Sequence, residues 1–333
     1  MGLLSSLYSL GLTCRTFYYR HLKTPGRLPV KVISIGNITL GGTGKTPAVI
    51  KVAEEARKRG FHPCILTRGY KGNIKETCFV SNGKEVMLNP DEAGDEPYLI
   101  AARLNGIPVV KGSKRYEAGL FALNRLAIRP SLIILDDGFQ HIAIERDINV
   151  LLIDGTNPFG NRKLFPEGIM REPLTAMRRA DYAIITKSDM IDKNALADIK
   201  AIIKNTSPGM PVYESAHKPA GLIHISGYTE EPEHISNKDV FVFAGIANSG
   251  YFASTVKMCG ARIKGFKWYR DHHAYSAKDM SWIRQKAEGL YIITTEKDLV
   301  KLKKLKVPEN LYALAIDFAV DNIFLDSIFR RLS

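Results

Sequence analysis

Three glycines followed by a Lys-Thr pair near the start of the chain have the spacing of a phosphate-binding loop. The segment Ser34–Pro47 reads SIGNITLGGTGKTP, and its first two residues end the apolar run VKVISI. A glycine-rich loop turns successive backbone N–H groups toward an anion, and the next helix adds its positive N-terminal end. Lys45 would reach the β- and γ-phosphates of a nucleotide, and the Thr46 hydroxyl would ligate Mg²⁺. We assign nucleotide contacts to Thr39, Leu40, Gly41, Gly42, Thr43, Gly44, Lys45 and Thr46.

This loop departs from the general pattern at one position, where Thr39 stands in place of the first glycine. The alternative is a glycine-rich turn that a Lys-Thr pair follows by chance. A strand before the loop and a helix over Ala48–Arg59 after it favour the phosphate-binding interpretation.

Two adjacent acids end another apolar run, SLIILDDGFQH. Leu132–Leu135 predicts a buried strand, and Asp136 and Asp137 emerge at its tip. Adjacent carboxylates repel each other unless a cation lies between them, and a phosphate-binding loop needs a carboxylate for its metal at a neighbouring strand end. We therefore predict a magnesium site here, with a surface Asp-Asp-Gly turn as the alternative.

Two more segments carry groups that can move protons. AGDEP places Asp95 and Glu96 at the start of a helix, where an Asp is also an ordinary N-cap. RDHHAYS, in the second half of the chain, contains His272 beside a second histidine and an aspartate. Such a histidine can orient a base or share its proton, although a structural role is equally consistent with the spacing.

The segment AIITKSD, residues 183–189, looks like the [NT]-K-x-D element with which GTPases read guanine. Together with the phosphate-binding loop, it makes a GTPase, of the ordinary P-loop or the metallochaperone type, the rival interpretation. Against it, Asp137 and Gly138 are contiguous, whereas the GTPase element separates its Asp and Gly by two residues. No switch threonine is evident between the loop and Asp136.

Composition narrows the class of partner. The 333 residues are 45% hydrophobic and 24% charged, as in a globular protein of about two domains, but the net charge is +13. That charge favours an anionic partner, and the scattering of the basic residues argues against nucleic acid. The four cysteines lie far apart, which argues against a zinc site or disulfide framework and fits a reducing cytoplasm.

The first 23 residues predict an amphipathic helix. They are too short and interrupted to span a bilayer, and no cleavage site for a signal peptide follows an apolar core. A helix lying on an anionic membrane surface and a helix packed on its own domain both fit this pattern. The apolar stripe consists of Leu3, Leu7, Leu10, Cys14 and Phe17.

Repeated strand-then-helix units predict an α/β fold with a parallel sheet. In the first part we expect strands at Val30–Ile35, His62–Leu66, Pro108–Val110, Leu132–Leu135, Val150–Ile153 and Tyr182–Thr186. The helices expected there are Pro47–Arg59, Glu96–Leu104, Lys114–Leu126 and Lys193–Asn205.

The strand-then-helix pattern loosens over residues 206–238, where we place the domain boundary. A second set follows: strands Val240–Ala244, Tyr291–Thr294 and Leu311–Ala315, with helices Ser249–Cys259 and Asp321–Leu332. We expect a surface helix over 1–23, a P-loop lobe over 24–215 and a smaller α/β lobe over 216–333.

Taken together, these segments resemble one family, the tetraacyldisaccharide 4′-kinases, which phosphorylate the lipid A precursor. The resemblance runs in the family's order from Gly36 to Asp298. It rests on GNITLGGTGKTP, LTRGYKG, GDEP, DDGFQH, FPEGIMREP, DHH and TTEKD. The Thr39 departure is itself like the family's loop.

The resemblance implies a membrane-associated P-loop kinase with two α/β lobes that uses ATP and Mg²⁺. It implies that Asp95 is the catalytic base, that His272 is its partner, and that Asp136 and Asp137 lie at the metal with Glu96 as a further ligand. Arg68, Gln140, His141 and Arg171 match positions that line the substrate site. The implied partners are the anionic lipid disaccharide and the cytoplasmic face of the bacterial inner membrane, where the N-terminal helix docks, and no nucleic acid.

Overall fold

The structure is a computed structural model that describes residues 2–332, apart from the side chains at positions 3 and 20. Leu3 of the predicted stripe therefore lies outside the described side chains. The chain forms two compact units. The larger consists of Met1–Ala216 with Phe318–Ser333, and the smaller is His217–Asp317.

The larger unit is built on a sheet that confirms the predicted α/β class. Its strand order is β8-β7-β6-β1-β5-β2-β4-β3, and all neighbours are parallel except the β3–β4 pair. The central strand β1 lies between β5 and β6, so its end meets the ends of both neighbours. The strands are β1 Lys31–Gly36, β2 Pro63–Thr67, β3 Cys78–Ser81, β4 Val109–Lys111, β5 Leu132–Asp136, β6 Ile148–Asp154, β7 Tyr182–Thr186 and β8 Val212–His224.

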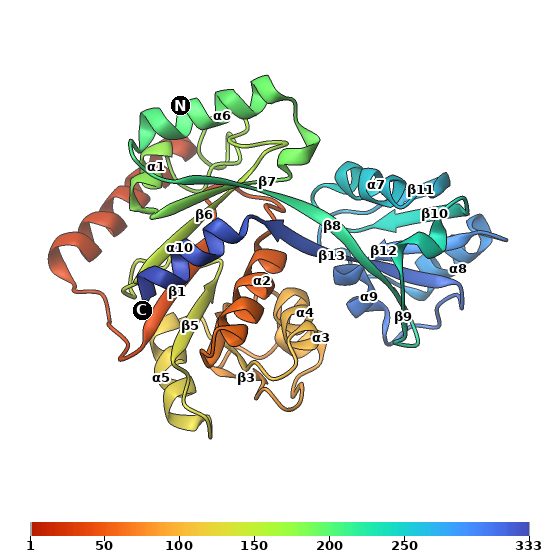
Figure 1. Cartoon of the computed structure of the whole chain (residues 1–333), viewed down its shortest axis with the longest axis horizontal. Coiled ribbons are helices and arrows are strands. Elements are labelled where there is room, and N and C mark those ends of the chain that lie inside the picture. The colour runs from red at the N-terminus through yellow and green to blue at the C-terminus, as the bar shows by residue number, and fades with distance from the viewer. Residues whose placement is uncertain (1, 333) are drawn as a thin grey trace. The chain divides into compact units, whose positions relative to one another are not determined.

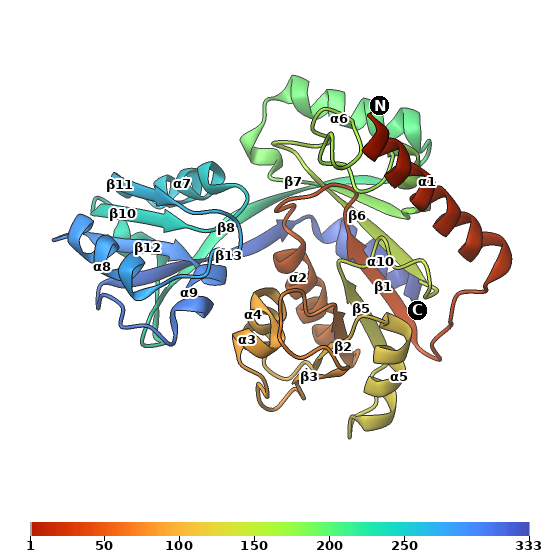
Figure 2. The ribbon, with the colours of Figure 1, turned by 180° about the vertical axis from the view of Figure 1, so that it is seen from behind.

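Helices cover both faces of this sheet because its strands are apolar on both sides. Ile33 and Ile35 of β1 face one core, whereas Val32 faces another. The first face is covered by α2 Lys45–Lys58, α3 Pro90–Ala93, α4 Asp95–Arg103 and α10 Asn322–Leu332. The other is covered by α1 Leu3–Phe17, α5 Arg115–Arg125 and α6 Lys193–Thr206. Helices α2 and α10 lie in front of the strands in Figure 1, and α1 and α5 lie in front in Figure 2.

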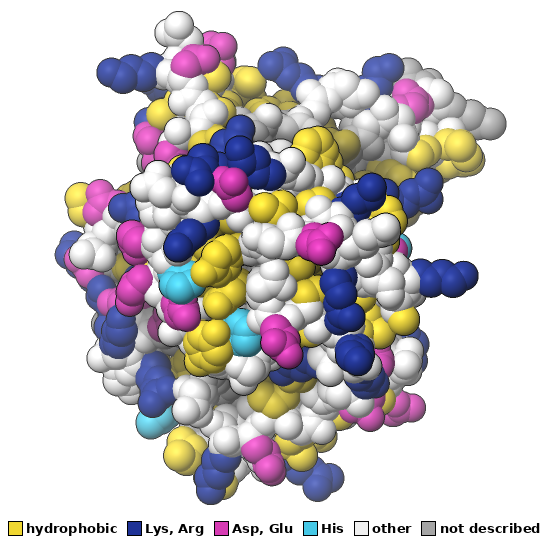
Figure 3. All heavy atoms as spheres, turned by 90° about the vertical axis from the view of Figure 1, so that its right-hand side faces the viewer, with side chains coloured by type: hydrophobic (Ala, Val, Ile, Leu, Met, Phe, Trp, Pro, Cys, Tyr) yellow, Lys and Arg dark blue, Asp and Glu magenta, His cyan; other side chains and the backbone are white. Residues whose placement is uncertain are grey.

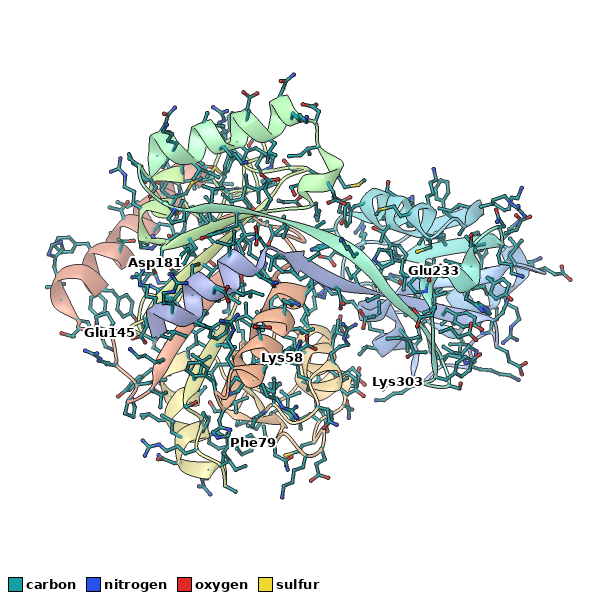
Figure 4. The ribbon with its side chains drawn as sticks, in the orientation of Figure 1. Lys58, Phe79, Glu145, Asp181, Glu233 and Lys303 are labelled. Atoms are coloured by element: carbon teal, nitrogen blue, oxygen red, sulfur yellow. The ribbon has the colours of Figure 1, made fainter. Side chains whose placement is uncertain are left out.

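Helix α10 belongs to the larger unit, which differs from the expected assignment of residues 216–333 to the smaller lobe. Phe324, Ile328 and Phe329 of α10 are buried in the core that α2 and α4 share. Asp181, which precedes β7 and is labelled in Figure 4, also pairs with Arg331 at the end of α10. An apolar face of this width must be buried, and the larger sheet supplies the surface that buries it.

The smaller unit has strands in the order β11-β10-β12-β13-β8, of which β11, β10, β12 and β13 are parallel to one another. They are β10 Asp239–Ala244, β11 Arg262–Trp268, β12 Tyr291–Thr295 and β13 Leu311–Val320, with the short β9 Thr229–Glu230 antiparallel to β8. Its helices are α7 Ser249–Met258, α8 Ala277–Lys286 and α9 Glu296–Leu302. Figure 3 looks onto this unit and shows basic, acidic and apolar side chains interspersed, without one basic patch.

Most predicted elements agree with the structure to within a few residues, but the predicted boundary region does not. Residues 206–238 contain the 13-residue strand β8, which continues from the larger unit into the smaller one. Its His, Lys and Pro residues hid the strand because only part of it is buried. The sequence interpretation also omitted β3, β11, α8 and α9. Shorter turns of helix are η1 Tyr18–Leu22, η2 Leu174–Arg179, η3 Ser188–Met190 and η4 Pro232–Ile235.

One face of the N-terminal helix α1 packs against the larger unit, and another face is exposed. Ser5 is buried, and Tyr8 and Leu12 pack against the core that contains α6. The predicted stripe lies on the other face, where the side chains of Leu7 and Leu10 are 57% and 60% exposed. Over residues 2–332, no helix has both the length and the apolar character needed to cross a bilayer.

Candidate active site

The predicted phosphate-binding loop joins the central strand β1 to helix α2. A Cβ added to Gly36 would lie 2.6 Å from the backbone nitrogen of Phe139, so the loops that follow β1 and β5 are in close contact. Gly41 and Gly44 adopt φ values of +113° and +78°, which favour glycine, and Gly44 is the N-cap of α2. Gly41 and Gly44 therefore adopt backbone angles of the kind for which the sequence predicted that the loop needs glycine.

The first residues of the loop are held by a neighbouring segment. Thr39 is buried and pairs with Met170, and the Leu40 N–H donates to the Ile169 carbonyl at 2.7 Å. The Asn37 side-chain amide donates to the Thr39 carbonyl at 2.8 Å. Thr39 thus occupies the position of the usual first glycine as a paired, extended residue.

Lys45 lies at the first position of α2 and faces the loop after β5. Its ammonium is 3.4 Å from Oδ1 of Asn37 and 3.6 Å from Oδ1 of Asp137. Thr46 follows at the second position of α2. The buried hydroxyls of Ser34 and Thr43 have no hydrogen-bond partner among the described residues. The loop therefore offers a cation and polar groups that its own protein leaves partly unsatisfied.

Asp136, the last residue of β5, is a buried carboxylate in an acidic environment. It is 4% exposed and accepts a hydrogen bond from the Thr67 hydroxyl at 2.9 Å. Burial, followed by the negative charges of Glu96 and Asp137, raises its pKa to about 7. Lys45 offsets only part of this negative charge, and a divalent cation would offset more of it.

Asp137, in contrast, lies among positive charges. Its carboxylate accepts hydrogen bonds from Nη1 and Nη2 of Arg171 at 2.7 and 2.9 Å. Burial alone would raise its pKa, but the charges of Lys45 and Arg171 outweigh burial and hold the pKa well below its ordinary range. Its φ of +49° lies in the left-handed region, which is uncommon for residues other than glycine.

Gln140 and Arg171, both predicted to contact substrate, belong to one polar network. The Gln140 amide donates to the Asn37 carbonyl at 2.7 Å and to Glu172 at 3.0 Å. Its Oε1 accepts from Arg171 at 3.1 Å. In this structure both side chains hold the loops after β1 and β5, and their contact with substrate stays a prediction.

Helix α1 reaches the same network. The Tyr8 hydroxyl donates to the Arg171 carbonyl at 3.0 Å, and Arg15 donates to the Gln140 carbonyl at 2.7 Å. The packed face of the N-terminal helix therefore contacts the loops that border the acidic pair.

A basic group lies beside these loops. Arg68 is exposed after β2, and His141 is half-buried. Burial, followed by the charge of Arg115, lowers the pKa of His141 to about 3, so this imidazole is neutral.

Arg115, which the sequence interpretation missed, is buried, and its Nε and Nη2 have no partner among the described residues. Burial lowers the pKa of Arg115 to about 10, which leaves it a cation with unused donors.

Asp95 is the first residue of α4, and Glu96 is the second. The N-cap is Gly94, with φ of +95°, so the alternative that Asp95 serves as the N-cap is wrong. Asp95 is half-buried, and its carboxylate lies at the positive end of the helix.

His272 lies in a loop of the smaller unit, with φ of +59°. Its N–H donates to the Gly245 carbonyl at 3.1 Å, and its Nε2 lies 3.2 Å from the Lys297 ammonium. The same Nε2 lies 3.9 Å from Oδ2 of Asp271.

The TTEKD segment supports this loop. Asp298, which is fully buried, accepts hydrogen bonds from the Gly245 N–H at 3.0 Å and from Lys301 at 2.7 Å. Lys301 also donates to the His273 carbonyl at 3.3 Å. One buried carboxylate thus ties the start of α9 to the loop that carries His272.

The carboxylates at the site suit a metal ion that is also bound by phosphate and water. Within residues 2–332, no three His, Cys, Asp or Glu side chains gather as a ready-made metal site. Mg²⁺ is usually held by one or two carboxylates together with substrate phosphates and water. Asp136, with Glu96 nearby, fits that mode.

Known proteins resemble this chain over most of its length. The model of the family described as tetraacyldisaccharide-1-P 4′-kinase matches residues 1–333. A tetraacyldisaccharide 4′-kinase of Syntrophus aciditrophicus is 39% identical over 323 residues, covering 91% of this chain and 85% of that protein. One from Halothermothrix orenii is 35% identical over 347 residues, with coverage of 96% and 88%.

A solved structure is similar along the whole length. It is described as the "apo" form of LpxK from Aquifex aeolicus in complex with ATP, and it aligns with a TM-score of 0.80 at 32% identity. The alignment covers 99% of this chain and 98% of that one. With a family match over the full length and relatives of this identity, the chain belongs to the tetraacyldisaccharide-1-P 4′-kinase family.

Proposed function

We propose that this protein transfers the γ-phosphate of ATP to the 4′-hydroxyl of the tetraacyldisaccharide 1-phosphate precursor of lipid A. The observation that carries the proposal is the loop between β1 and α2, where Lys45 lies beside Asp137 and next to the buried acid Asp136. Family membership supplies the acceptor. The relatives are named as kinases, and nothing favours the GTPase alternative.

The nucleotide would occupy the loop formed by residues 39–46. The backbone N–H groups of this loop and the N-terminus of α2 would bind the phosphates. Lys45 would move from Asp137 to the β- and γ-phosphates, because phosphate oxygens offer it a stronger partner than a carboxylate already paired with Arg171.

Asp136, Glu96 and Thr46 are proposed to hold Mg²⁺, with Asp137 as a further ligand once Lys45 has turned to phosphate. Support comes from the raised pKa of Asp136, which burial and the neighbouring acids cause. When bound, the ion would supply charge that offsets the phosphate oxygens. Arg171 would keep Asp137 ionised and oriented during this exchange.

Asp95 is proposed as the base that takes the proton of the 4′-hydroxyl, and His272 as the group that tunes it. Asp95 is not used as a helix cap. His272 is held by its backbone at Gly245, and its Nε2 lies 3.2 Å from the Lys297 ammonium. A base within reach of the hydroxyl is what phosphoryl transfer to an alcohol requires.

Basic and polar side chains near the acidic pair are proposed to bind the phosphorylated disaccharide. Arg68, His141, Gln140 and Arg171 were predicted for this role, and Arg115 joins them because its buried donors are unsatisfied. A substrate phosphate would satisfy those donors in a bidentate manner.

The exposed stripe of α1 is proposed to rest on the anionic cytoplasmic face of the bacterial inner membrane. Leu7, Leu10 and Phe17 are exposed on one side of the helix while Tyr8 packs on the other. A four-chain lipid leaves a bilayer only at high cost, so the enzyme must reach the lipid at the surface.

The test is incubation of the purified protein with γ-labelled ATP, Mg²⁺ and the lipid disaccharide 1-phosphate, followed by separation of the lipid. We expect label in the lipid and none when Mg²⁺ is chelated. If the protein hydrolyses GTP rapidly without lipid and does not use ATP, the proposal is wrong and the GTPase alternative is correct.

A further inference from the structure

The segment Thr186–Asp189, which resembles a guanine-reading element, contacts the phosphate-binding loop within the larger unit. The Thr186 hydroxyl donates to the Thr43 carbonyl at 3.1 Å. The Lys187 ammonium donates to the Gly42 carbonyl at 2.8 Å. Two consecutive residues at the end of β7 therefore bind two consecutive carbonyls of the loop.

Those carbonyls need donors for a physical reason. When the N–H groups of a loop point toward an anion, its carbonyl groups point away from the anion and into the protein. A buried carbonyl without a donor is costly, so an unsupported loop would gain by rotating its peptide groups. Thr186 and Lys187 satisfy Gly42 and Thr43 in the orientation that presents their N–H groups.

The ammonium of Lys187 is buried and held in place by an ion pair. Its side chain is only 3% exposed, and its ammonium lies 2.5 Å from Oδ2 of Asp154 at the end of β6. The other oxygen of Asp154 accepts from the backbone N–H and hydroxyl of Thr156 at 3.0 and 2.7 Å. A buried lysine is tolerated only when it is paired and hydrogen-bonded, and both conditions are met.

The backbone supports the same geometry. Lys187 has φ of +56° and ψ of +35°, a left-handed conformation that is unfavourable for a lysine. The Gly155 N–H donates to the Thr186 carbonyl at 2.8 Å, and a Cβ on Gly155 would lie 2.8 Å from that oxygen. The ends of β6 and β7 are thus joined so that Lys187 meets both Asp154 and the loop.

We propose that Thr186, Lys187 and Asp154 are positioning residues that hold the Gly42 and Thr43 peptide groups in the orientation that binds nucleotide phosphates. This inference rests on the nucleotide site of the proposed function, but it concerns ATP binding and needs no lipid acceptor. In this interpretation the TKSD segment acts on the phosphate-binding loop through its Thr and Lys, while the side chain of Asp189 is exposed.

The experiment compares Lys187→Met and Thr186→Val with the wild-type full chain. Equilibrium titration with MgATP gives the affinity, and melting with and without MgATP gives the ligand-dependent rise in Tm. Since a charge-assisted hydrogen bond to the loop is lost, we expect Lys187→Met to bind ATP about tenfold more weakly. Thr186→Val, which keeps the side-chain shape, should bind a few-fold more weakly, and the ATP-dependent rise in Tm should shrink in both.

Ser188→Ala is the matched control, because this neighbouring hydroxyl donates to the Ser215 carbonyl at 3.3 Å and not to the loop. It should bind ATP like the wild type. If Lys187→Met does not fold, Thr186→Val decides the matter alone. Variants that melt earlier but bind ATP with unchanged affinity would overturn the inference. Absence of ATP binding by the wild type would reject the proposed function and this inference with it.

Discussion

At the scale of residues, Asp136 and Asp137 are chain neighbours with opposite properties. The carboxyl of Asp136 is buried among other acids, and its pKa is raised to about 7. That of Asp137 is bound by Arg171 and faces Lys45, which keeps it ionised. The pair therefore combines a carboxylate that needs a cation with one that is already balanced.

Asp136 should make the protein less stable as the pH rises. Its pKa is about 4 in an unfolded chain and about 7 in the folded one, so the folded state binds the proton more tightly. Stability should fall between these two values, by at most about 1.4 kcal/mol for each pH unit, and the penalty is complete above pH 7. Asp136→Asn removes this dependence, so the variant should melt higher than the wild type at pH 8 without Mg²⁺, and by little at pH 5.

The measurement is Tm against pH for both proteins, with Asp198→Asn on exposed α6 as control. The same Asp136→Asn variant should lose kinase activity. A Tm difference that does not change between pH 5 and pH 8 would show that the carboxyl of Asp136 has an ordinary pKa.

Lys45→Ala should reduce turnover while leaving the fold intact. The ammonium is expected to meet the β- and γ-phosphates, and loss of one such electrostatic contact costs about a hundredfold or more in rate. Lys58→Ala, at the exposed end of the same helix and labelled in Figure 4, is the control and should be neutral. Near-normal turnover by Lys45→Ala at saturating ATP would refute the assignment of residues 39–46 to the nucleotide.

At the scale of elements, α1 fits both alternatives that its sequence left open. One face packs on the larger unit through Tyr8 and Leu12, and the stripe containing Leu7 and Leu10 is exposed. Because Tyr8 and Arg15 donate to carbonyls of Arg171 and Gln140, the helix that would meet the lipid also contacts the loops at the site.

Replacing Leu7 and Leu10 by Asp should weaken binding to vesicles that contain anionic lipid, since the change removes apolar contact and adds repulsion. Thr13→Asp with Thr16→Asp adds the same charge outside the stripe and separates the two effects. Cosedimentation gives binding, and ATP affinity shows whether the fold survives. Two results together would place the stripe in the core. The double Leu variant would largely unfold, and the fraction that stays folded would still bind vesicles.

At the scale of the whole molecule, the chain passes between its two units twice. It leaves the larger unit within β8 and returns within β13, so that α10 completes the larger core. Asp95 belongs to the larger unit and His272 to the smaller.

Alanine variants of Asp95 and His272 should be strongly non-additive in turnover. Two residues that act as one unit lose most of the rate singly, and the double variant loses little more. ATP affinity and Tm should change little, because neither residue is assigned to the nucleotide or to the core. Turnover with lipid is measured on both single variants and the double variant. Rate losses that simply multiply, with unchanged stability, would mean that the two residues act independently.

The sequence by itself determined the features that depend on neighbours along the chain. Strands such as Tyr182–Thr186, the glycines of the loop, and the acids at the tip of β5 follow from apolar runs and local backbone requirements. The order of the motifs also identified the family, which the match over residues 1–333 confirms.

Only the tertiary structure decided which of these groups face one another. Arg171 meets Asp137 across 34 residues, and Lys187 meets Gly42 across 145. The burial of Arg115 and the return of α10 to the larger sheet are equally non-local. Such contacts depend on strand order in the sheet, where β6 and β5 flank β1 although distant from it in sequence. Hydrophobic spacing fixes which face of an element is buried, but not which other element covers it.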